Sequence, residues 1–209
     1  MKSILISIQP KWVAKILNGY KTIEIRKTIP KCELPCKVYI YCSKDKRQIL
    51  AGTHLVKESW LCWDRNEWSA QEKKDMQHGR YNGHIVAEFI LKEVETIEKN
   101  QVYNASVVRH NACLNIMQLH DYIKGKKFHA WHIDNLTIYE KPKDLNNFYK
   151  PCKHIKNGEC YLYSEQCNHL GIEIKLKDGV AHSAREHVCC RYIKRAPQDW
   201  CYVEDNNGY

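Results

Sequence analysis

The stretch "NGYKTIEIRK", Asn18 to Lys27, places a helix-ending glycine directly before an alternating strand pattern. Upstream, the apolar residues of segment 10–18 fall on one helical face, and Pro10 suits the first position of a helix because its missing N–H would be unpaired there. Gly19 follows the last apolar residue, where a left-handed backbone commonly ends a helix. The sequence therefore predicts a short helix over residues 10–18 and a turn at Gly19.

The strand that follows, within residues 21–26, has two chemically different sides. Side chains alternate with period two along a strand. Ile23 and Ile25 are expected to face the core, and Thr22, Glu24 and Arg26 are expected to face the opposite way. Lys21 lies at the entry of the strand, beside the turn. Lys21, Glu24 and Arg26 either form a solvated ion pair on the surface of the sheet or converge on a ligand.

The rest of the pattern predicts a mixed α+β protein. Further strands are expected over residues 2–8, 38–42, 49–56 (interrupted at Gly52), 85–95 and 130–139, with a helix over 117–123. This irregular spacing favours a mixed barrel over a βαβ fold. The pattern changes near residues 148–151, which divides the chain into a barrel over 1–149 and a Cys/His-rich segment with a closing strand over 150–209.

Positive charge is concentrated at the start of the chain. Residues 1–47 hold eleven Lys and Arg against three Asp and Glu, a surplus of eight within the net charge of +9. Such a concentration is the electrostatic footprint of a polyanion-binding protein, with RNA or another nucleic acid as the expected partner. The alternative is a solubilising surface, although its charges are usually dispersed and mixed in sign.

Hydropathy excludes several other classes. No apolar run approaches the length that spans a bilayer, so no membrane partner is expected. The apolar part of the N-terminus, ILISI, is too short for a secretion signal. A cytoplasmic monomer is the expectation.

The cysteines point to a metal site near the end of the chain. Eleven cysteines, an odd number, argue for reduced thiols and against a disulfide framework. Six of them lie in residues 150–209 together with four histidines. These groups predict one structural Zn²⁺, with inert thiols and surface histidines as the alternative. The proposed ligands are Cys152, Cys160, Cys167 and Cys190.

The motif Gly19-x-Lys21-x-x-Glu24-x-Arg26, after a strand and a short helix, resembles the signature of the ASCH domain family. The flanking segment QPKWVAKIL is similar to the stand-alone bacterial and phage branch, and HIDNLTIYEKPKDL and RAPQDWCYVE resemble its later strands. The resemblance implies a PUA-like β-barrel with flanking helices. It also implies a cleft into which Lys21, Glu24 and Arg26 project.

The resemblance further implies nucleic-acid or nucleotide ligands. Some relatives in the family are amidohydrolases that act on N4-acetylcytidine, and others are described as ribonucleases. In the amidohydrolase branch a lysine activates a threonine. Lys21 and Thr22 match that branch, but Glu24 stands where the nucleophilic threonine would be. Binding of RNA or a nucleotide is therefore favoured, and the alternative is a hydrolase (an N4-acylcytidine amidohydrolase or a ribonuclease) with Lys21, Thr22 and Glu24 as candidate catalytic residues.

Elementary chemistry suggests how such a cleft would hold its ligand. The guanidinium fork of Arg26 matches two oxygens of a phosphate, and Glu24 would hold Arg26 or Lys21 in place or accept hydrogen bonds from a base. Trp12 would either stack on a base or belong to the core. The expected phosphate contacts are Lys11, Lys15 and Lys27.

Overall fold

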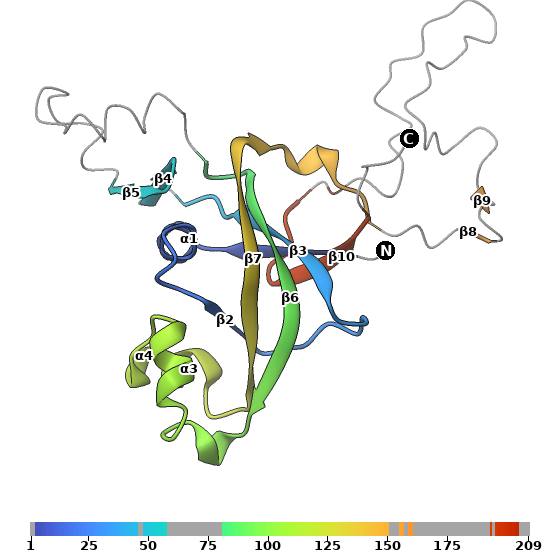
Figure 1. The fold of residues 1–209 in the computed structure, drawn as a ribbon. Helices are drawn as coiled ribbons and strands as arrows, with labels where there is room; N and C mark the ends of the chain where they lie inside the picture. Colours follow the sequence, from blue (N-terminus) through green and yellow to red (C-terminus); the bar gives the residue numbers. More distant parts are fainter. Residues whose placement is uncertain are drawn as a thin grey trace, which may run out of the picture.

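A computed structural model describes residues 3–45, 48–57, 81–150, 155–156, 159–160, 193 and 195–204. A six-stranded mixed sheet lies at the centre, in the order β10-β1-β3-β6-β7-β2 (Figure 1). Its strands are β1 (Ser3–Ile8), β2 (Ile23–Arg26), β3 (Cys36–Cys42), β6 (Ile85–Ile97), β7 (Phe128–Lys143) and β10 (Trp200–Val203). The predicted α+β class is confirmed.

The sheet is open within the described residues, which corrects the expectation of a closed barrel. Strands β1 and β3 run parallel, the other neighbours run antiparallel, and β2 and β10 stand at the two edges. Each edge strand has only four residues. Arg26 of β2 instead donates from its side chain to Ser7 O of β1 and to Asp199, the residue before β10, and no ladder joins β2 to β10 in the described residues.

The remaining elements are short. Two hairpins pair β4 (Gln48–Ala51) with β5 (His54–Lys57) and β8 (Ile155–Lys156) with β9 (Glu159–Cys160). The helices are α1 (Pro10–Leu17), α3 (Ser106–Asn111) and α4 (Ile116–Ile123), with 3-10 turns η3 (Lys99–Gln101) and η4 (Leu145–Asn147). The predicted interruption at Gly52 is the turn of the first hairpin, where Gly52 has a φ of 58°.

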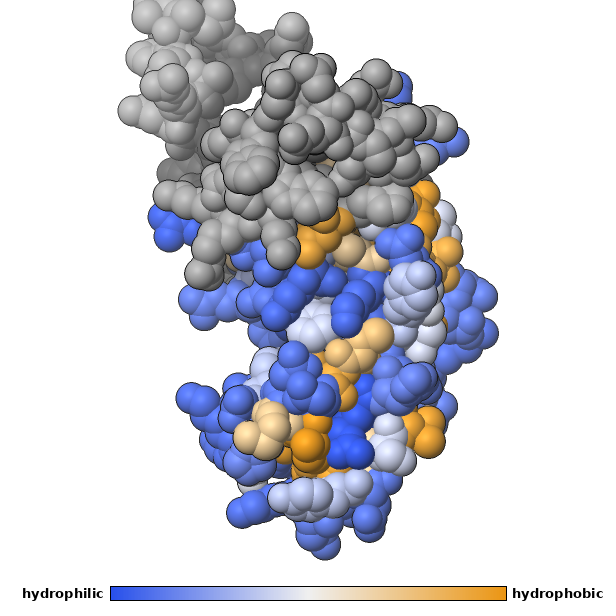
Figure 2. Space-filling model, turned by 90° about the vertical axis from the view of Figure 1, so that its left-hand side faces the viewer, coloured by the Kyte–Doolittle hydropathy of each residue, from blue (hydrophilic) through white to orange (hydrophobic). Residues whose placement is uncertain are grey.

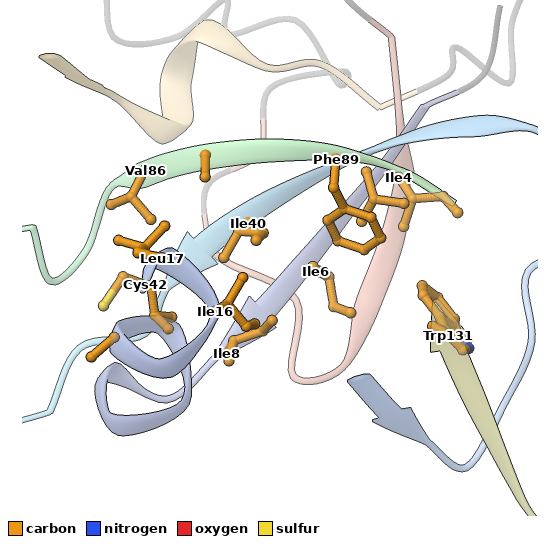
Figure 3. Close-up of a cluster of buried hydrophobic side chains, with 14 of the residues drawn as sticks. Ile4, Ile6, Ile8, Ile16, Leu17, Ile40, Cys42, Val86, Phe89 and Trp131 are labelled. Atoms are coloured by element: carbon orange, nitrogen blue, oxygen red, sulfur yellow. The ribbon is translucent and has the colours of Figure 1, made fainter. Parts of the chain in front are cut away.

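Two hydrophobic clusters position the helices. The first lies between α1 and the sheet and includes Ile6, Ile16, Ile40 and Phe89 (Figure 3). The second contains Ile23 and Ile25 together with buried residues of α3 and α4, among them Leu119. The predicted inward direction of Ile23 and Ile25 is thus confirmed.

Strand β10 brings the end of the described chain back to its beginning. It pairs antiparallel with β1, from Ser3 opposite Val203 to Ile6 opposite Trp200. The predicted closing strand therefore joins the sheet. The sheet thus continues from β10 through β1 to β3. Residues from the start and from the end of the described chain therefore share one core.

The described segments carry neither a disulfide nor a membrane-spanning helix. Among the side chains that are described, five cysteines are free thiols: Cys32, Cys36, Cys42, Cys113 and Cys201. In the same ranges, no helix is long and apolar enough to cross a bilayer.

Candidate functional site

Backbone hydrogen bonds fix the turn that delivers the motif to β2. Gly19 has a φ of +74°, the left-handed geometry predicted for the end of α1. The N–H of Lys21 donates to Lys15 O at 3.1 Å, which ties the turn to α1. The N–H of Thr22 donates to Asn111 O at 2.9 Å, which ties it to α3. The motif thus enters the sheet between two helices.

Lys21, Glu24 and Arg26 converge in a buried ion cluster. Glu24 lies between the two cations, with Oε2 at 3.2 Å from Lys21 Nζ and Oε1 at 3.1 Å from Arg26 Nη2. The exposed fractions are 3 % for Lys21, 8 % for Glu24 and 6 % for Arg26. The structure therefore brings the three charged motif residues together, but beneath the surface.

The ammonium group of Lys21 is saturated with partners. Besides Glu24, it donates to Ile23 O at 2.7 Å and to Ala112 O at 3.0 Å. An ammonium group has three donors, so each of them has an acceptor here. Thr22 is exposed, and no hydrogen bond joins its hydroxyl to Lys21 within the described part of the chain. In this arrangement Lys21 holds α3 against β2 and does not activate Thr22.

Arg26 makes its closest contact with a residue from the far end of the chain. Its Nη1 lies 2.6 Å from Asp199 Oδ1, and its Nη2 donates to Ser7 O at 2.8 Å. Asp199 also accepts from Thr28 at 3.2 Å, and Trp200 Nε1 donates to the same threonine hydroxyl at 2.8 Å. Sequence reasoning missed Asp199. Its only signal was its place just before the closing strand.

The four charged groups of the cluster balance. Lys21 and Arg26 carry two positive charges, and Glu24 and Asp199 carry two negative ones. Because both terminal nitrogens of Arg26 are engaged, a phosphate could reach its fork only by displacing Asp199 or Glu24. Of the nitrogens of this guanidinium group, Nε alone is buried without a hydrogen-bond partner. Cations that could contact a phosphate directly are therefore expected at the surface, outside the ion cluster.

Three ammonium groups surround Trp12 on α1. The Nζ atoms of Lys11, Lys15 and Lys21 lie 4.7, 5.3 and 5.5 Å from the centroid of its ring. Trp12 is half-buried and packs against the first hydrophobic cluster, so it serves the core with one part of its side chain. We call Lys11, Trp12 and Lys15 the α1 surface. Helix α1 lies on the left-hand side of Figure 1, the side that faces the viewer in Figure 2, where hydrophilic and hydrophobic side chains are interleaved.

Lys27, at the other end of β2, lies over a different aromatic ring. Its Nζ is 4.8 Å from the centroid of Tyr122, which is on α4 and 38 % exposed. Burial raises the pKa of Tyr122, the charge of Arg26 opposes that rise, and the charges of Glu24 and Asp199 add to it. Tyr122 thus lies within electrostatic reach of the ion cluster. Sequence reasoning missed it, because one tyrosine in a short helix carries no signal.

The predicted zinc ligands cannot be placed. Cys152, Cys167 and Cys190 lie outside the described residues, and Cys160 belongs to β9 but its side chain is not described. Among the side chains that are described, no group of three His, Cys, Asp or Glu could hold a metal ion. The structural Zn²⁺ stays a prediction from the sequence.

Several known proteins are similar to this chain in sequence or in structure. No protein-family model matches the chain. A curated protein from Zymomonas mobilis, named "ASCH domain-containing ribonuclease", is 24% identical over 118 residues, which cover 53% of this chain and 78% of that protein. The crystal structure of ASCH from the same organism is 18% identical, with a TM-score of 0.41 over 71% of each chain. A mutant form of that protein gives a TM-score of 0.45 at 18% identity, covering 69% of this chain and 77% of the other.

The sequence similarity and the N-terminal motif lead to the same assignment. The curated relative carries the family name that Gly19, Lys21, Glu24 and Arg26 predict, and the similarity extends over most of its length. The chain is thus similar in sequence to a protein that is named for its ASCH domain.

Proposed function

We propose that this protein binds RNA through the α1 surface, with the buried ion cluster holding that surface in place. The main observation in its support is that three lysine ammonium groups lie within 5.5 Å of the centroid of the half-buried Trp12 ring. An aromatic face flanked by cations can stack on a base and contact the neighbouring phosphates. The surplus of positive charge in residues 1–47 and the name of the curated ribonuclease support RNA as the ligand.

The energies favour exchange of the internal contacts for RNA. A lysine over a tryptophan at an exposed site contributes about 0.5–1 kcal/mol. Stacking of a base on an aromatic side chain contributes about 1–3 kcal/mol. A base can therefore take the place of Lys15 at the ring, and the exposed ammonium group can turn to a phosphate. Lys21 remains beneath, because its three donors are bound to the protein.

The buried cluster has a positioning role in this proposal. Lys21 joins Trp12 on α1 to Glu24 on β2, and Arg26 joins Glu24 to Asp199 next to β10. Because the cluster is charge-balanced, it adds little net attraction for a phosphate. It instead fixes the position of α1 relative to the sheet edge.

Hydrolysis of RNA is the second candidate. It is favoured by the name of the curated relative, a ribonuclease, and by the presence of a carboxylate, Glu24, at the centre of the motif. Both oxygens of Glu24 are engaged with cations, and Lys21 makes no bond to the Thr22 hydroxyl in the described region. Proton abstraction by either group would require these bonds to rearrange. Binding is therefore the function that this geometry supports better.

Fluorescence anisotropy with a labelled single-stranded RNA tests the proposal. Affinity should fall steeply with salt, and Lys11→Ala with Lys15→Ala should reduce the slope of log K against log salt by about 1.4, since each lysine contributes about 0.7 on a single strand. The matched control removes Lys141 and Lys143 at the far end of β7. Salt-independent binding, or equal losses in the two double variants, would overturn the proposal.

The same RNA separates binding from hydrolysis. Wild-type protein and the Glu24→Gln variant are each incubated with the oligonucleotide, and the products are separated by size. Intact RNA that is bound with a salt-dependent affinity supports binding. Cleavage by wild type that is lost in Glu24→Gln, while the variant remains folded at the assay temperature, would establish the hydrolase instead.

A further inference from the structure

Strand β2 lies between two helices that each present an aromatic ring to it. Figure 1 shows β2 with α1 on one side and α4 on the other. At the start of the strand, Lys21 lies 5.5 Å from the Trp12 ring of α1. Just after its end, Lys27 lies 4.8 Å from the Tyr122 ring of α4. A lysine–aromatic pair thus lies near each end of β2, and only the first includes a residue of the α1 surface, Trp12.

The second pair is the more exposed of the two. Lys27 and Tyr122 are both exposed, whereas Lys21 is buried and Trp12 is half-buried. Neighbouring residues Leu119 and Ile123 are fully packed in the second hydrophobic cluster. These packed neighbours therefore hold Tyr122 in place, while the residue remains partly accessible.

Several lysines follow Tyr122 closely along the chain. Helix α4 ends at Ile123, and the turn that follows carries three exposed lysines against one acidic residue in the helix, Asp121. The left-handed backbone of Lys124, with a φ of 50°, ends the helix and turns the chain back toward β7. We call this set the α4 surface: Tyr122, Lys27, Lys124, Lys126 and Lys127.

We propose that the α4 surface is a second stacking platform for RNA, so that the ligand is a single strand that runs along β2 from Trp12 to Tyr122. This inference rests on the proposed function and specifies its ligand. A single strand fits because both rings need unstacked bases, which a duplex does not offer. A mononucleotide could occupy only one of the two rings.

Binding would proceed by exchange of contacts. A base stacks on the exposed face of Tyr122 in place of the Lys27 ammonium group, which is weakly held at an exposed ring. Lys27 then turns to the adjacent phosphate, and Lys124 and Lys126 contact the backbone beyond it. The hydroxyl of Tyr122 takes no part, because stacking uses the ring.

Substitutions at Tyr122 test the inference by anisotropy with a labelled ten-nucleotide single strand. Tyr122→Ala should weaken binding about tenfold, the effect expected for one stacked base. Tyr122→Phe should bind within about twofold of wild type, since the ring is kept. The matched control is Tyr103→Ala, which removes a tyrosine that is 74% exposed. Melting temperatures identify any variant that has lost its fold.

Ligand length provides the second measurement. Competition by a mononucleotide, by the ten-nucleotide strand and by a duplex of the same sequence should give the tightest binding for the single strand. Lys124→Ala with Lys126→Ala should weaken the ten-nucleotide strand and leave mononucleotide binding unchanged.

The outcomes separate this inference from the proposed function. If Trp12→Ala weakens binding and Tyr122→Ala does not, the α1 surface binds RNA and the α4 platform is overturned. If a mononucleotide binds as tightly as the strand, the two-platform ligand is overturned as well. If Tyr122→Phe also weakens RNA binding, the contribution of Tyr122 comes from its hydroxyl group, which would contradict stacking. Absence of RNA binding in the wild type would overturn the proposed function itself.

Discussion

Both sides of β2 are buried, but they are chemically opposite. On one side, Ile23 and Ile25 are 2% and 4% exposed and pack among residues of α3 and α4. On the other, Glu24 and Arg26 are 8% and 6% exposed and belong to the ion cluster. A four-residue strand thus carries an apolar contact and an ionic contact back to back.

The difference shows which side stabilises the fold and which side orients the candidate site. Burial of an aliphatic side chain stabilises by about 1.5–3 kcal/mol relative to its exposed state. In a buried ion pair, the cost of desolvation largely offsets the attraction, so its net contribution is small. The apolar side therefore contributes net stability, and the ionic side fixes the relative positions of β2, α1 and β10.

Removal of the Glu24 carboxylate should lower the free energy of unfolding more than any other change proposed here, because it disrupts the ionic side of β2. Glu24→Ala leaves the buried Lys21 without its carboxylate partner and leaves Arg26 paired with Asp199 alone. The free energy of unfolding should fall by about 3–5 kcal/mol, the usual cost of an uncompensated buried charge. Urea unfolding followed by circular dichroism measures it.

Glu24→Gln is the control for that experiment, because it keeps the shape and the hydrogen-bond acceptor of the side chain. It should lose less stability than the alanine variant. A loss below about 1 kcal/mol in Glu24→Ala would mean that the cluster is hydrated and unlike the buried pairs on which this magnitude is based.

Truncation on the apolar side should come second. Ile25→Ala removes buried methyl groups and leaves a cavity among the residues of α3 and α4. We expect a loss of about 3 kcal/mol in the free energy of unfolding, and about 1 kcal/mol for Ile25→Val. The two urea midpoints test this. An alanine variant as stable as the valine variant would show that the helices collapse onto the strand.

The Arg26–Asp199 pair should give a smaller effect, because the Asp199 side chain is 40 % exposed. Asp199→Asn keeps a hydrogen-bond acceptor and removes the charge. The unfolding free energy should drop by about 1 kcal/mol, less in high salt, as for a partly solvated ion pair. Asp121→Asn, at an exposed position of α4, serves as the matched control and should be near neutral.

Acid should produce the smallest effect, through His129. This buried histidine stands opposite Arg26 in the β2–β7 pairing, and its ring contacts Thr96 Oγ1 at 2.9 Å. Burial lowers the pKa of His129, and the charge of Lys127 lowers it further. The unfolded chain binds this proton near pH 6.5, about the ordinary value, and the folded chain only below it.

The stability that His129 contributes should therefore be complete above about pH 6.5 and decline as the pH falls through that value toward the lowered pKa. Urea midpoints at neutral and mildly acidic pH should differ more in wild type than in His129→Gln. His120→Gln, at an exposed position, should retain the wild-type dependence. An identical pH dependence in wild type and His129→Gln would contradict the assignment.

Local features of the fold were predictable because their causes are local. The apolar face of α1, its proline start and the left-handed Gly19 lie within ten residues of one another. The alternation of Ile23 and Ile25 with Glu24 and Arg26 correctly separates the two sides of β2. The closing strand was also predictable, from the resemblance of its segment to a later strand of the family.

The ion cluster was only partly predictable. Glu24 and Arg26 are two positions apart, so they share one side of the strand. Lys21 reaches Glu24 from the turn before β2, a meeting that the resemblance implied and the alternation did not. Asp199 is 173 positions from Arg26, and no local pattern links them. The open sheet was missed for the same reason, since closure depends on whether two short edge strands pair or are joined by side chains.

The sequence by itself determined which residues share each side of β2, because side-chain direction along a strand follows from the backbone alone. Only the tertiary structure decided what covers each side. Packing of α3 and α4 buried the isoleucines, and the return of β10 buried the charges beneath Asp199. Period two assigns a residue to a side, but burial and charge balance depend on segments that reach that side from elsewhere in the chain.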